Sequence, residues 1–408
     1  MRNISAVKQI MSFADDDYIK KIGIDPKKLI SMAGGWVNHS APEELRQAYE
    51  NIVSDRELFH ISGKYSATFG ESEFKKAICK FENYLYGMKI NEKNIAAGSG
   101  STQLTINLFS TILDPNDKIL LLDPYYCNLP TQILTFIPGV KILTFPVIDE
   151  KNWEFIAEKK INQFEKYILE KKPKIIFLTS PDNPTSRILS DKFMNTALRA
   201  AKKIDAVIIV DFAYKELVFN ENTPKYFSWS PNENFISIRS NSKWCRGLGR
   251  RLGWIEASEK IIKAMESIQN STSLCPDSLH QLALTKFINN AIENQTLLSY
   301  ISDTRKKYRE VSEKTANLIE KYLKLPVIIP EGGMYFFVNV NVDGTKFVEQ
   351  ALKKTGVLFV PGWGFGKTGK KAIRISIGPL INDIEKIEEG LKRISKNFSE
   401  ILGDKNTT

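Results

Sequence analysis

The chain has 408 residues, of which 42% are hydrophobic and 25% are charged. These values are typical of a folded globular protein, and the length predicts two interlocked domains rather than one simple core. The net charge of +10 comes from basic residues spread along the chain, and no zinc-finger, RNA-binding or basic-zipper pattern is present, so binding to nucleic acid is not expected.

Cysteine usage and the lack of long apolar segments predict a cellular location. No run of about eighteen apolar residues occurs, so we predict no membrane span. Residues 1–20 contain three aspartates and no continuous apolar stretch, which does not fit a signal peptide. The four cysteines are widely spaced, without a CxxC pair, and this predicts reduced thiols in a cytoplasmic protein.

Four short apolar runs lie in the middle of the chain, at 118–122, 174–178, 206–210 and 235–238. Helical patterns separate them, and such an alternation is typical of a parallel α/β sheet that is buried on both faces. Polar residues follow each run directly. Because ligands of such sheets bind at the carboxyl ends of the strands, we expect these polar residues to form the site.

The last third of the chain has a different pattern. Residues 279–323 have a helical period, short strands are expected at 327–329, 334–340, 356–360 and 372–377, and a closing helix at 384–394. This pattern predicts a smaller α+β domain with its own sheet. We therefore expect an N-terminal arm at 1–45, a large domain at 46–275 and a small C-terminal domain at 276–408, with a frayed polar tail at 403–408.

The first motif along the chain is a Gly/Ser-rich turn at 97–103, which enters a helical pattern. Such a turn presents free backbone N–H groups to an anion, with Gly100, Ser101 and Thr102 as donors, although many helices begin with Ser or Thr as ordinary caps. After the following apolar run, Tyr126 lies at a strand end. A single tyrosine in this position is equally consistent with core packing.

Two further motifs follow the second and third apolar runs. In the segment 180–185 (SPDNPT), two prolines fix a loop that presents the amide of Asn183. Asp211 directly follows the third run, and Tyr214 lies three residues later. A carboxylate at this strand end suits a ligand, but it also fits a helix N-cap, and Tyr214 alone fits a core position.

The segment 240–254 (SNSKWCRGLGRRLGW) contains the lysine that we expect to carry the chemistry, Lys243. Arg251 lies eight residues later, between Gly249 and Gly253. Glycines let the backbone turn tightly and let an anion approach, and an arginine offers a two-donor fork for phosphate. A lysine in a glycine-rich loop is weak evidence alone, because most lysines are solvated.

The last motif places Arg374 between two isoleucines in an expected strand, after the segment 360–366 (VPGWGFG). An arginine flanked by apolar residues in a strand is unusual without an anionic partner. The alternative is an edge-strand arginine that faces water.

Together these motifs resemble the class I/II aminotransferases, the aspartate aminotransferase superfamily of fold type I, in order and spacing from about residue 31 to residue 394. The resemblance implies an α/β fold with a mostly parallel central sheet flanked by helices, a smaller α+β domain, and the cofactor pyridoxal 5′-phosphate (PLP). It implies that Lys243 forms an imine with the cofactor aldehyde and that Asp211 pairs with the ring nitrogen. Tyr214 and Asn183 would meet the phenolate oxygen, Tyr126 would stack on the ring, and Arg374 would bind the substrate α-carboxylate.

The same resemblance implies a phosphate site formed by Gly100, Ser101, Thr102, Ser240 and Arg251. Gly35 and Trp36, next to Gly34, match the segment that closes over substrate. Tyr65 matches the tyrosine that reaches the cofactor phosphate of the neighbouring subunit, and this match implies a homodimer.

Three positions depart from the family pattern or leave it ambiguous. Arg246 stands where the family usually has glycine, and it would either extend the phosphate contacts, meet an acidic substrate group or remain solvated. Arg250 is adjacent to Arg251, so their roles could be exchanged, although spacing favours Arg251. Ser186 replaces the usual final glycine of its motif, which affects the local turn.

The activity implied by the resemblance is transamination between an L-amino acid and a 2-oxo acid. A lyase, cyclase or oxidase on the same scaffold is the alternative, and an aminotransferase-like sensor domain is a remote one, because only about thirty residues precede the glycine pair at 34–35. The three histidines, His39, His60 and His280, match no metal spacing, so no metal site is predicted. The sequence does not indicate the amino-acid side chain.

Overall fold

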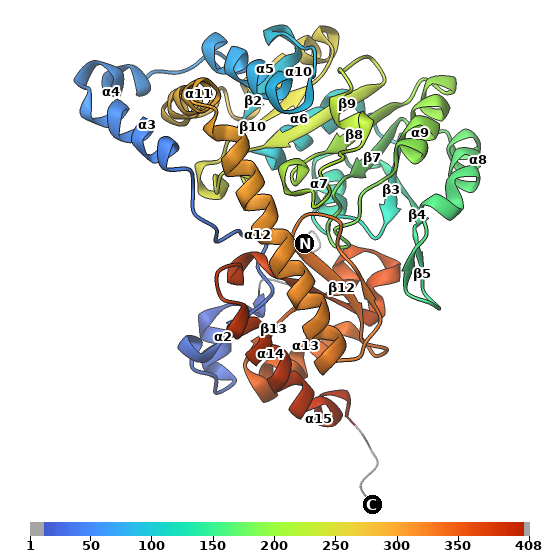
Figure 1. The fold of residues 1–408 in the computed structure, drawn as a ribbon. Helices are drawn as coiled ribbons and strands as arrows, with labels where there is room; N and C mark the ends of the chain where they lie inside the picture. The colour runs from blue at the N-terminus through green and yellow to red at the C-terminus, as the bar shows by residue number, and fades with distance from the viewer. Residues whose placement is uncertain (1–11, 404–408) are drawn as a thin grey trace, which may run out of the picture.

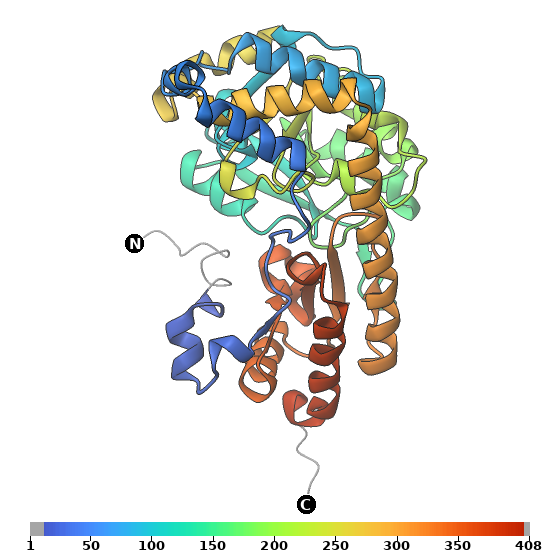
Figure 2. The same ribbon diagram turned by 60° about the vertical axis from the view of Figure 1, so that its left-hand side comes forward.

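The computed structural model describes residues 12–403, and it has a large upper part and a smaller lower part (Figures 1 and 2). The expected frayed tail, apart from Gly403, and the first part of the expected N-terminal arm lie outside the described residues. Within this range no helix is both long enough and apolar enough to cross a bilayer.

A seven-stranded sheet forms the centre of the large part, in the order β2-β10-β9-β8-β7-β3-β4. Only β10 runs antiparallel to its neighbours. The four expected strands are confirmed as β3, β7, β8 and β9, and three further strands of the sheet were not predicted. The strand bounds are β2 Ile95–Gly98, β3 Lys118–Asp123, β4 Lys141–Pro146, β7 Ile175–Thr179, β8 Val207–Asp211, β9 Phe235–Ser240 and β10 Gly253–Glu256.

Alternate side chains of the central strands enter two different cores, as a sheet that is covered on both faces requires. Ile119 and Leu121 pack in one core, with helices α6, α7 and α10, whereas Leu120 packs in the other, with α8 and α9. The bounds of these helices are α6 Ser101–Ile112, α7 Leu129–Phe136, α8 Ile161–Lys171, α9 Asp191–Lys203 and α10 Glu259–Thr272.

A third core lies at the β2–β10 end of the sheet, where α3, α5 and α11 pack together beside α4. These helices span α3 Glu43–Ser54, α4 Arg56–Ser62, α5 Ser72–Tyr86 and α11 Ser278–Glu293. The helical stretch expected at 279–323 is therefore two helices, α11 and α12 (Thr296–Tyr322), because the chain turns at Gln295 with a left-handed φ of 59°.

The long helix α12 runs from the large part down along the small part, as both ribbon views show (Figures 1 and 2). Its Leu297 packs in the core of the large part, whereas its Ile319 packs in the core of the small part. Since α11 packs wholly on the large part, we propose that the domain boundary lies within α12 rather than at the expected residue 276.

The small part contains a four-stranded antiparallel sheet in the order β11-β12-β15-β14. The strand expected at 356–360 is divided, because β13 pairs in parallel with β1 whereas β14 joins the larger sheet. The N-terminal segment thus belongs to the small part. The bounds are β1 Ile30–Ser31, β11 Val327–Ile328, β12 Tyr335–Asn339, β13 Val357–Leu358, β14 Val360–Pro361, β15 Ala372–Ser376, α2 Asp16–Lys21, α13 Gly344–Thr355, α14 Ile384–Lys396 and α15 Phe398–Leu402.

A short hairpin, β5 (Ile148–Asp149) and β6 (Glu154–Phe155), extends from the large part after β4. Trp153 in its turn packs on Phe337 of β12 and donates from Nε1 to the Phe337 carbonyl at 2.9 Å. The hairpin thus joins the two parts on the side away from α12, and the site lies where these two parts meet.

Candidate active site

A cavity of about 300 Å³ lies at the carboxyl ends of β7, β8 and β9, where the large part faces β12 and β15 of the small part. This is the position at which open α/β sheets bind ligands. Every site residue predicted from the sequence lines this cavity, apart from Gly100 and Tyr65: Gly35, Trp36, Ser101, Thr102, Tyr126, Asn183, Asp211, Tyr214, Ser240, Lys243, Arg251 and Arg374.

Lys243 follows β9 and reaches across the cavity to donate from Nζ to the carbonyl of Gly35. Desolvation, followed by the positive charges of Arg374 and Arg251, lowers the pKa of Lys243 to about 8, and Asp211 opposes the shift. A substantial fraction of the amine is therefore neutral near physiological pH, which is the form that can attack an aldehyde or accept a proton.

Asp211 is the last residue of β8, and the cavity reaches its carboxylate. The Ala213 N–H donates to Oδ1 at 3.0 Å. Desolvation raises the pKa of Asp211 to about 6, against this hydrogen bond and the attraction of Lys243. A half-buried carboxylate with one oxygen free of this hydrogen bond suits a cationic ring nitrogen as a partner. The positive charge of such a nitrogen would lower the free-energy cost of ionising Asp211.

Backbone donors and polar side chains gather at one end of the cavity, where α6 begins. Ser240 Oγ donates to Ser242 Oγ at 2.7 Å, and Arg251 Nη1 donates to the Leu248 carbonyl at 2.7 Å. The N-terminus of α6 adds the free N–H groups of its first turn, at Ser101 and Thr102. These donors fit a phosphate.

Gly100 does not line the cavity but permits its geometry. It caps α6 with a φ of 86°, and a Cβ at this position would lie 2.5 Å from Arg251 Nη2.

The positions of the adjacent arginines, Arg250 and Arg251, favour Arg251 as the phosphate partner. Arg250 lies over the Tyr49 ring at 4.3 Å, outside the cavity, whereas Arg251 lines it.

Arg374 occupies β15, between β12 and β14, and its side chain is 6% exposed. It is therefore not an edge-strand arginine that faces water. Nη1 donates to Asn183 Oδ1 at 2.9 Å and Nη2 to the Ala33 carbonyl at 2.7 Å. Its buried Nε has no acceptor among residues 12–403, and a carboxylate bound in the cavity would supply one.

Tyr335 is a cavity residue that sequence reasoning did not single out. Its hydroxyl is 2.8 Å from that of Tyr214, and its ring lies 4.2 Å from the Arg374 guanidinium. It stands at the start of β12, opposite Ser376 of β15. The strand expected at 334–340 contains it, but only the pairing of β12 with β15 brings it beside Arg374.

Three more residues have positions that the sequence left open. Arg246 donates to Asn38 Oδ1 and to the His39 carbonyl, away from the cavity lining. Ser186 has a φ of 56°, so it adopts the left-handed conformation that glycine favours, and its Oγ accepts from the Tyr335 N–H at 2.9 Å. Tyr65 is 84% exposed, between α4 and α5, and is not brought to this chain's cavity.

Within residues 12–403, no group of three or more His, Cys, Asp and Glu side chains is arranged to hold a metal ion. His39 and His280 are both buried and take part in hydrogen bonds within the large part. Burial lowers the pKa of His39 to about 4 and that of His280 to about 3, so both rings are neutral at physiological pH.

Comparison with known proteins gives a consistent result. The family described as aminotransferase class I and II matches residues 29–394. The chain is 28% identical to an aspartate aminotransferase of Thermotoga maritima, over 90% of this chain and 93% of that protein. It is 26% identical to aromatic-amino-acid aminotransferase 2 of Thermococcus litoralis, over 91% and 92% of the two chains.

Among solved structures, the fold is similar to that of an aspartate aminotransferase from Thermotoga maritima, with a TM-score of 0.81, 25% identity, and coverage of 97% of this chain and 98% of that one. The predicted fold class and cofactor are confirmed. The chain therefore belongs to aminotransferase class I and II, a family of PLP-dependent enzymes.

Proposed function

We propose that this protein moves the amino group of an uncharged L-amino acid to a 2-oxo acid, with PLP attached to Lys243. The observation that carries the proposal is the meeting of Lys243, Asp211 and Arg374 in one cavity. These three groups supply an amine, a partner for a ring nitrogen and a partner for a carboxylate. Homologues named as aminotransferases support the reaction type.

The cavity offers a partner for each polar group of PLP. Ser101, Thr102, Ser240 and Arg251 would hold the phosphate, and Asp211 would keep the ring nitrogen protonated. When bound, PLP withdraws electrons from the substrate α-carbon and makes its proton acidic. Three residues complete the site, with Tyr214 and Asn183 at the phenolate oxygen and Tyr126 on the ring face.

Lys243 and Arg374 would act on the substrate itself. The Arg374 guanidinium would bind the α-carboxylate through a two-donor fork that includes the unpartnered Nε, and so fix the direction of the α-hydrogen. Once the substrate amine has replaced it on the cofactor, the freed Lys243 amine, with its lowered pKa, would take that proton at Nζ and return it to the cofactor carbon to which Lys243 had been attached.

The preference for an uncharged side chain rests on the charges of the cavity. Among the residues that the structure describes, its cations are Lys243, Arg251 and Arg374, and each already has a role. The rest of the lining is largely apolar or aromatic, with Trp36, Leu248, Tyr335, Val360 and Phe365. A second carboxylate would lose its hydration there without gaining a cation.

An anaerobic titration with single amino acids, without any oxo acid, tests the proposal. We expect phenylalanine or leucine to replace the absorption band of lysine-bound PLP with that of pyridoxamine phosphate, and a 2-oxo acid to reverse the change. A rate with aspartate more than about tenfold above that with phenylalanine would contradict the side-chain preference. Turnover without pyridoxamine phosphate would instead indicate a lyase, cyclase or oxidase.

We also propose that the protein is a cytoplasmic homodimer in which Tyr65 reaches the partner subunit's phosphate site. The exposure of Tyr65 and of Val53, Phe59 and Ile61 on the neighbouring helices α3 and α4 supports an interface on this side. The four free cysteines support a reducing compartment. Sedimentation as an active monomer would contradict the dimer. Tyr65→Phe should weaken PLP binding in the dimer, because the Tyr65 hydroxyl would no longer reach the phosphate site of the partner subunit.

A further inference from the structure

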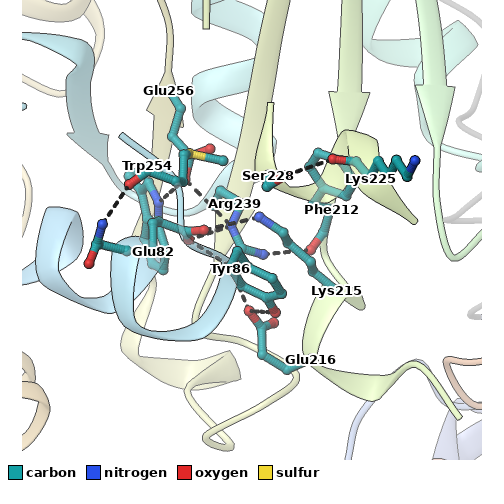
Figure 3. A network of polar contacts seen from close by, with 12 residues as sticks. Glu82, Tyr86, Phe212, Lys215, Glu216, Lys225, Ser228, Arg239, Trp254 and Glu256 are labelled. Atoms are coloured by element: carbon teal, nitrogen blue, oxygen red, sulfur yellow. Dashed lines mark hydrogen bonds and ion pairs between the residues drawn. The ribbon is translucent and has the colours of Figure 1, made fainter. Parts of the chain in front are cut away.

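Five ionisable side chains are buried together under the strand ends that form the active site, and none of them lines the cavity. Figure 3 shows them converging from α5, the turn after β8, and strands β9 and β10. We call this group the buried charge cluster. Its members are Glu82, Lys215, Glu216, Arg239 and Glu256.

Arg239 is the centre of the buried charge cluster. Its Nε donates to Glu82 Oε1 at 2.8 Å, and its Nη2 to Glu216 Oε1 at 2.6 Å. Its Nη1 donates to the backbone carbonyl of Phe212 at 3.2 Å. One planar guanidinium therefore joins α5, the turn that carries Glu216 and the end of β8, a geometry that a lysine ammonium cannot reproduce.

Lys215 forms the second connection between α5 and this turn. Its Nζ donates to Glu82 Oε2 at 3.0 Å and lies 3.8 Å from the ring centre of Tyr86. The Tyr86 hydroxyl donates to Glu216 Oε1 at 3.1 Å. Burial alone would raise the pKa of Glu82, but the attraction of Arg239 and Lys215 outweighs burial and lowers it, so Glu82 is ionised.

Glu256 lies at the edge of the cluster, and its carboxyl group accepts from Trp254 Nε1 at 3.0 Å. Burial and the repulsion of Glu82 raise the pKa of Glu256 to about 7. When Glu256 carries a proton, Glu82 and Glu216 balance Lys215 and Arg239. The formal charges of these four groups then cancel within the chain, although Glu216 Oε2 and Glu256 Oε2 have no hydrogen-bond partner among residues 12–403.

Two members of the cluster, Arg239 and Lys215, are adjacent in sequence to active-site residues. Arg239 directly precedes Ser240 and lies four residues before Lys243. Phe212, which Arg239 holds by its carbonyl, directly follows Asp211. Lys215 directly follows Tyr214. Because neighbouring residues share one backbone, the contacts of Arg239 and Lys215 restrain the active-site residues beside them in the sequence.

A purely structural role would be met as well by apolar residues, because desolvating charges costs free energy that hydrophobic packing does not. We propose that the buried charge cluster is a positioning device, in which Arg239 and Glu216 fix the backbone at 211–216 relative to 239–243 and thereby set Asp211 and Tyr214 against Lys243. This proposal rests on the proposed function for the chemistry of those three residues. Arg239 and Glu216 are positioning residues because they touch neither substrate nor cofactor.

The test compares variants of the cluster with control variants that lose a similar amount of thermal stability, both as holoenzyme and without cofactor. Arg239→Lys keeps the charge but cannot make the three contacts together. Glu216→Gln keeps the shape and removes one charge, and it provides a second variant if Arg239→Lys does not fold. The control is Ile168 of α8, which is fully buried in the core beneath α8 and α9 and is not a member of the buried charge cluster. Ile168→Val and Ile168→Ala bracket the loss of thermal stability without touching the site.

Two measurements separate positioning from stability. Arg239→Lys should raise the midpoint of the pH titration of the cofactor absorption band by about half a pH unit or more, because a ring nitrogen less firmly paired with Asp211 draws fewer electrons from the bond to Lys243. In the protein without cofactor, amide hydrogen exchange should rise about tenfold at 211–217 and 239–245. The Ile168 variants should leave both quantities unchanged.

The proposal is overturned if Arg239→Lys loses thermal stability as the Ile168 variants do while its titration midpoint and its exchange at 211–217 stay at the wild-type values. Failure of the proposed function has a different signature, because the wild-type protein would then form no pyridoxamine phosphate with an amino acid. The titration and the exchange comparison need no transamination, so they still decide the positioning role in that case.

Discussion

Arg239 and Arg374 are both buried on central strands, yet their surroundings differ. Arg239 contacts Glu82 and Glu216 and a backbone carbonyl within the chain. Among residues 12–403, Arg374 donates to an amide oxygen and a backbone carbonyl but to no carboxylate, and its Nε has no acceptor. An arginine whose charge is balanced inside the fold supports structure, whereas one left without a carboxylate is prepared for a ligand.

The same contrast applies to the two lysines of the region and gives the largest expected effect. Lys215 is paired with Glu82, whereas Lys243 faces the cavity and forms no ion pair with a carboxylate of the part of the chain that the structure describes. We expect Lys243→Ala to reduce transamination by about 10³-fold or more, because it removes both the attachment point and the base. Borohydride reduction of the holoenzyme followed by peptide mapping should place the cofactor on Lys243. Labelling of Lys215 would reverse this assignment.

Replacing each arginine by alanine should separate stability from binding. Arg239→Ala leaves Glu82 and Glu216 buried without a partner, and we expect a loss of about 3–5 kcal/mol in the free energy of unfolding. Arg374→Ala strands no carboxylate, so its stability loss should be much smaller. Instead the KM for the amino acid should rise about 10- to 100-fold while PLP stays bound. Urea unfolding and steady-state kinetics measure the two effects, and equal destabilisation by both variants would contradict the distinction.

Asp211 shows that a residue kept for a ligand costs stability before the ligand binds. Its folded-state pKa of about 6 is raised above the ordinary value of 3.8, so between these values the folded state binds more protons than the unfolded state. The stability of the protein without PLP therefore falls as pH rises from about 4 to 6, and the cost remains at pH 7.5. Asp211→Asn should stabilise the cofactor-free protein at pH 7.5 by about 1–2 kcal/mol, after allowance for solvent in the cavity.

The control for this prediction is the same pair of proteins at pH 4, where Asp211 is protonated in the folded state and the two stabilities should converge. The variant should also bind PLP more weakly, because the ring nitrogen loses its charged partner. Thermal unfolding with and without PLP gives both comparisons. A variant that is less stable than wild type at both pH values would show that the carboxylate is satisfied within the chain.

The active site was easier to predict from the sequence than the buried charge cluster. Lys243, Asp211 and Asn183 stand in motifs at or after the ends of recognisable strands, Arg374 stands within one, and the structure brings them into one cavity. The buried charge cluster left no such signal, because Glu82 lies far along the chain from Arg239 and nothing local distinguishes it from a surface glutamate. Pairings between distant segments decide whether a charge is buried.

The same reason explains the errors in the fold. The alternation of apolar runs was enough for β3, β7, β8 and β9, but β10 returns antiparallel, and no local pattern indicates direction. The expected strand at 356–360 was divided because its two halves pair with different partners, β1 and β15. Tyr335 was missed as a site residue because only the pairing of β12 with β15 sets it beside Arg374.

Ser186 offers the smallest and most specific test of the boundary between scaffold and site. Its φ of 56° favours glycine, whereas its Oγ accepts the Tyr335 N–H, and Tyr335 in turn contacts Tyr214. Ser186→Gly removes the backbone strain but loses the hydrogen bond, each worth about 1 kcal/mol, so the net change in unfolding free energy should stay within about 1 kcal/mol. Ser186→Ala keeps the strain and loses the bond, and it should be the less stable of the two.

If the Ser186 side chain also positions Tyr335, both variants should lower kcat by a similar small factor, whatever their free energies of unfolding. A kcat loss that follows the unfolding free energy instead would assign Ser186 to the scaffold alone.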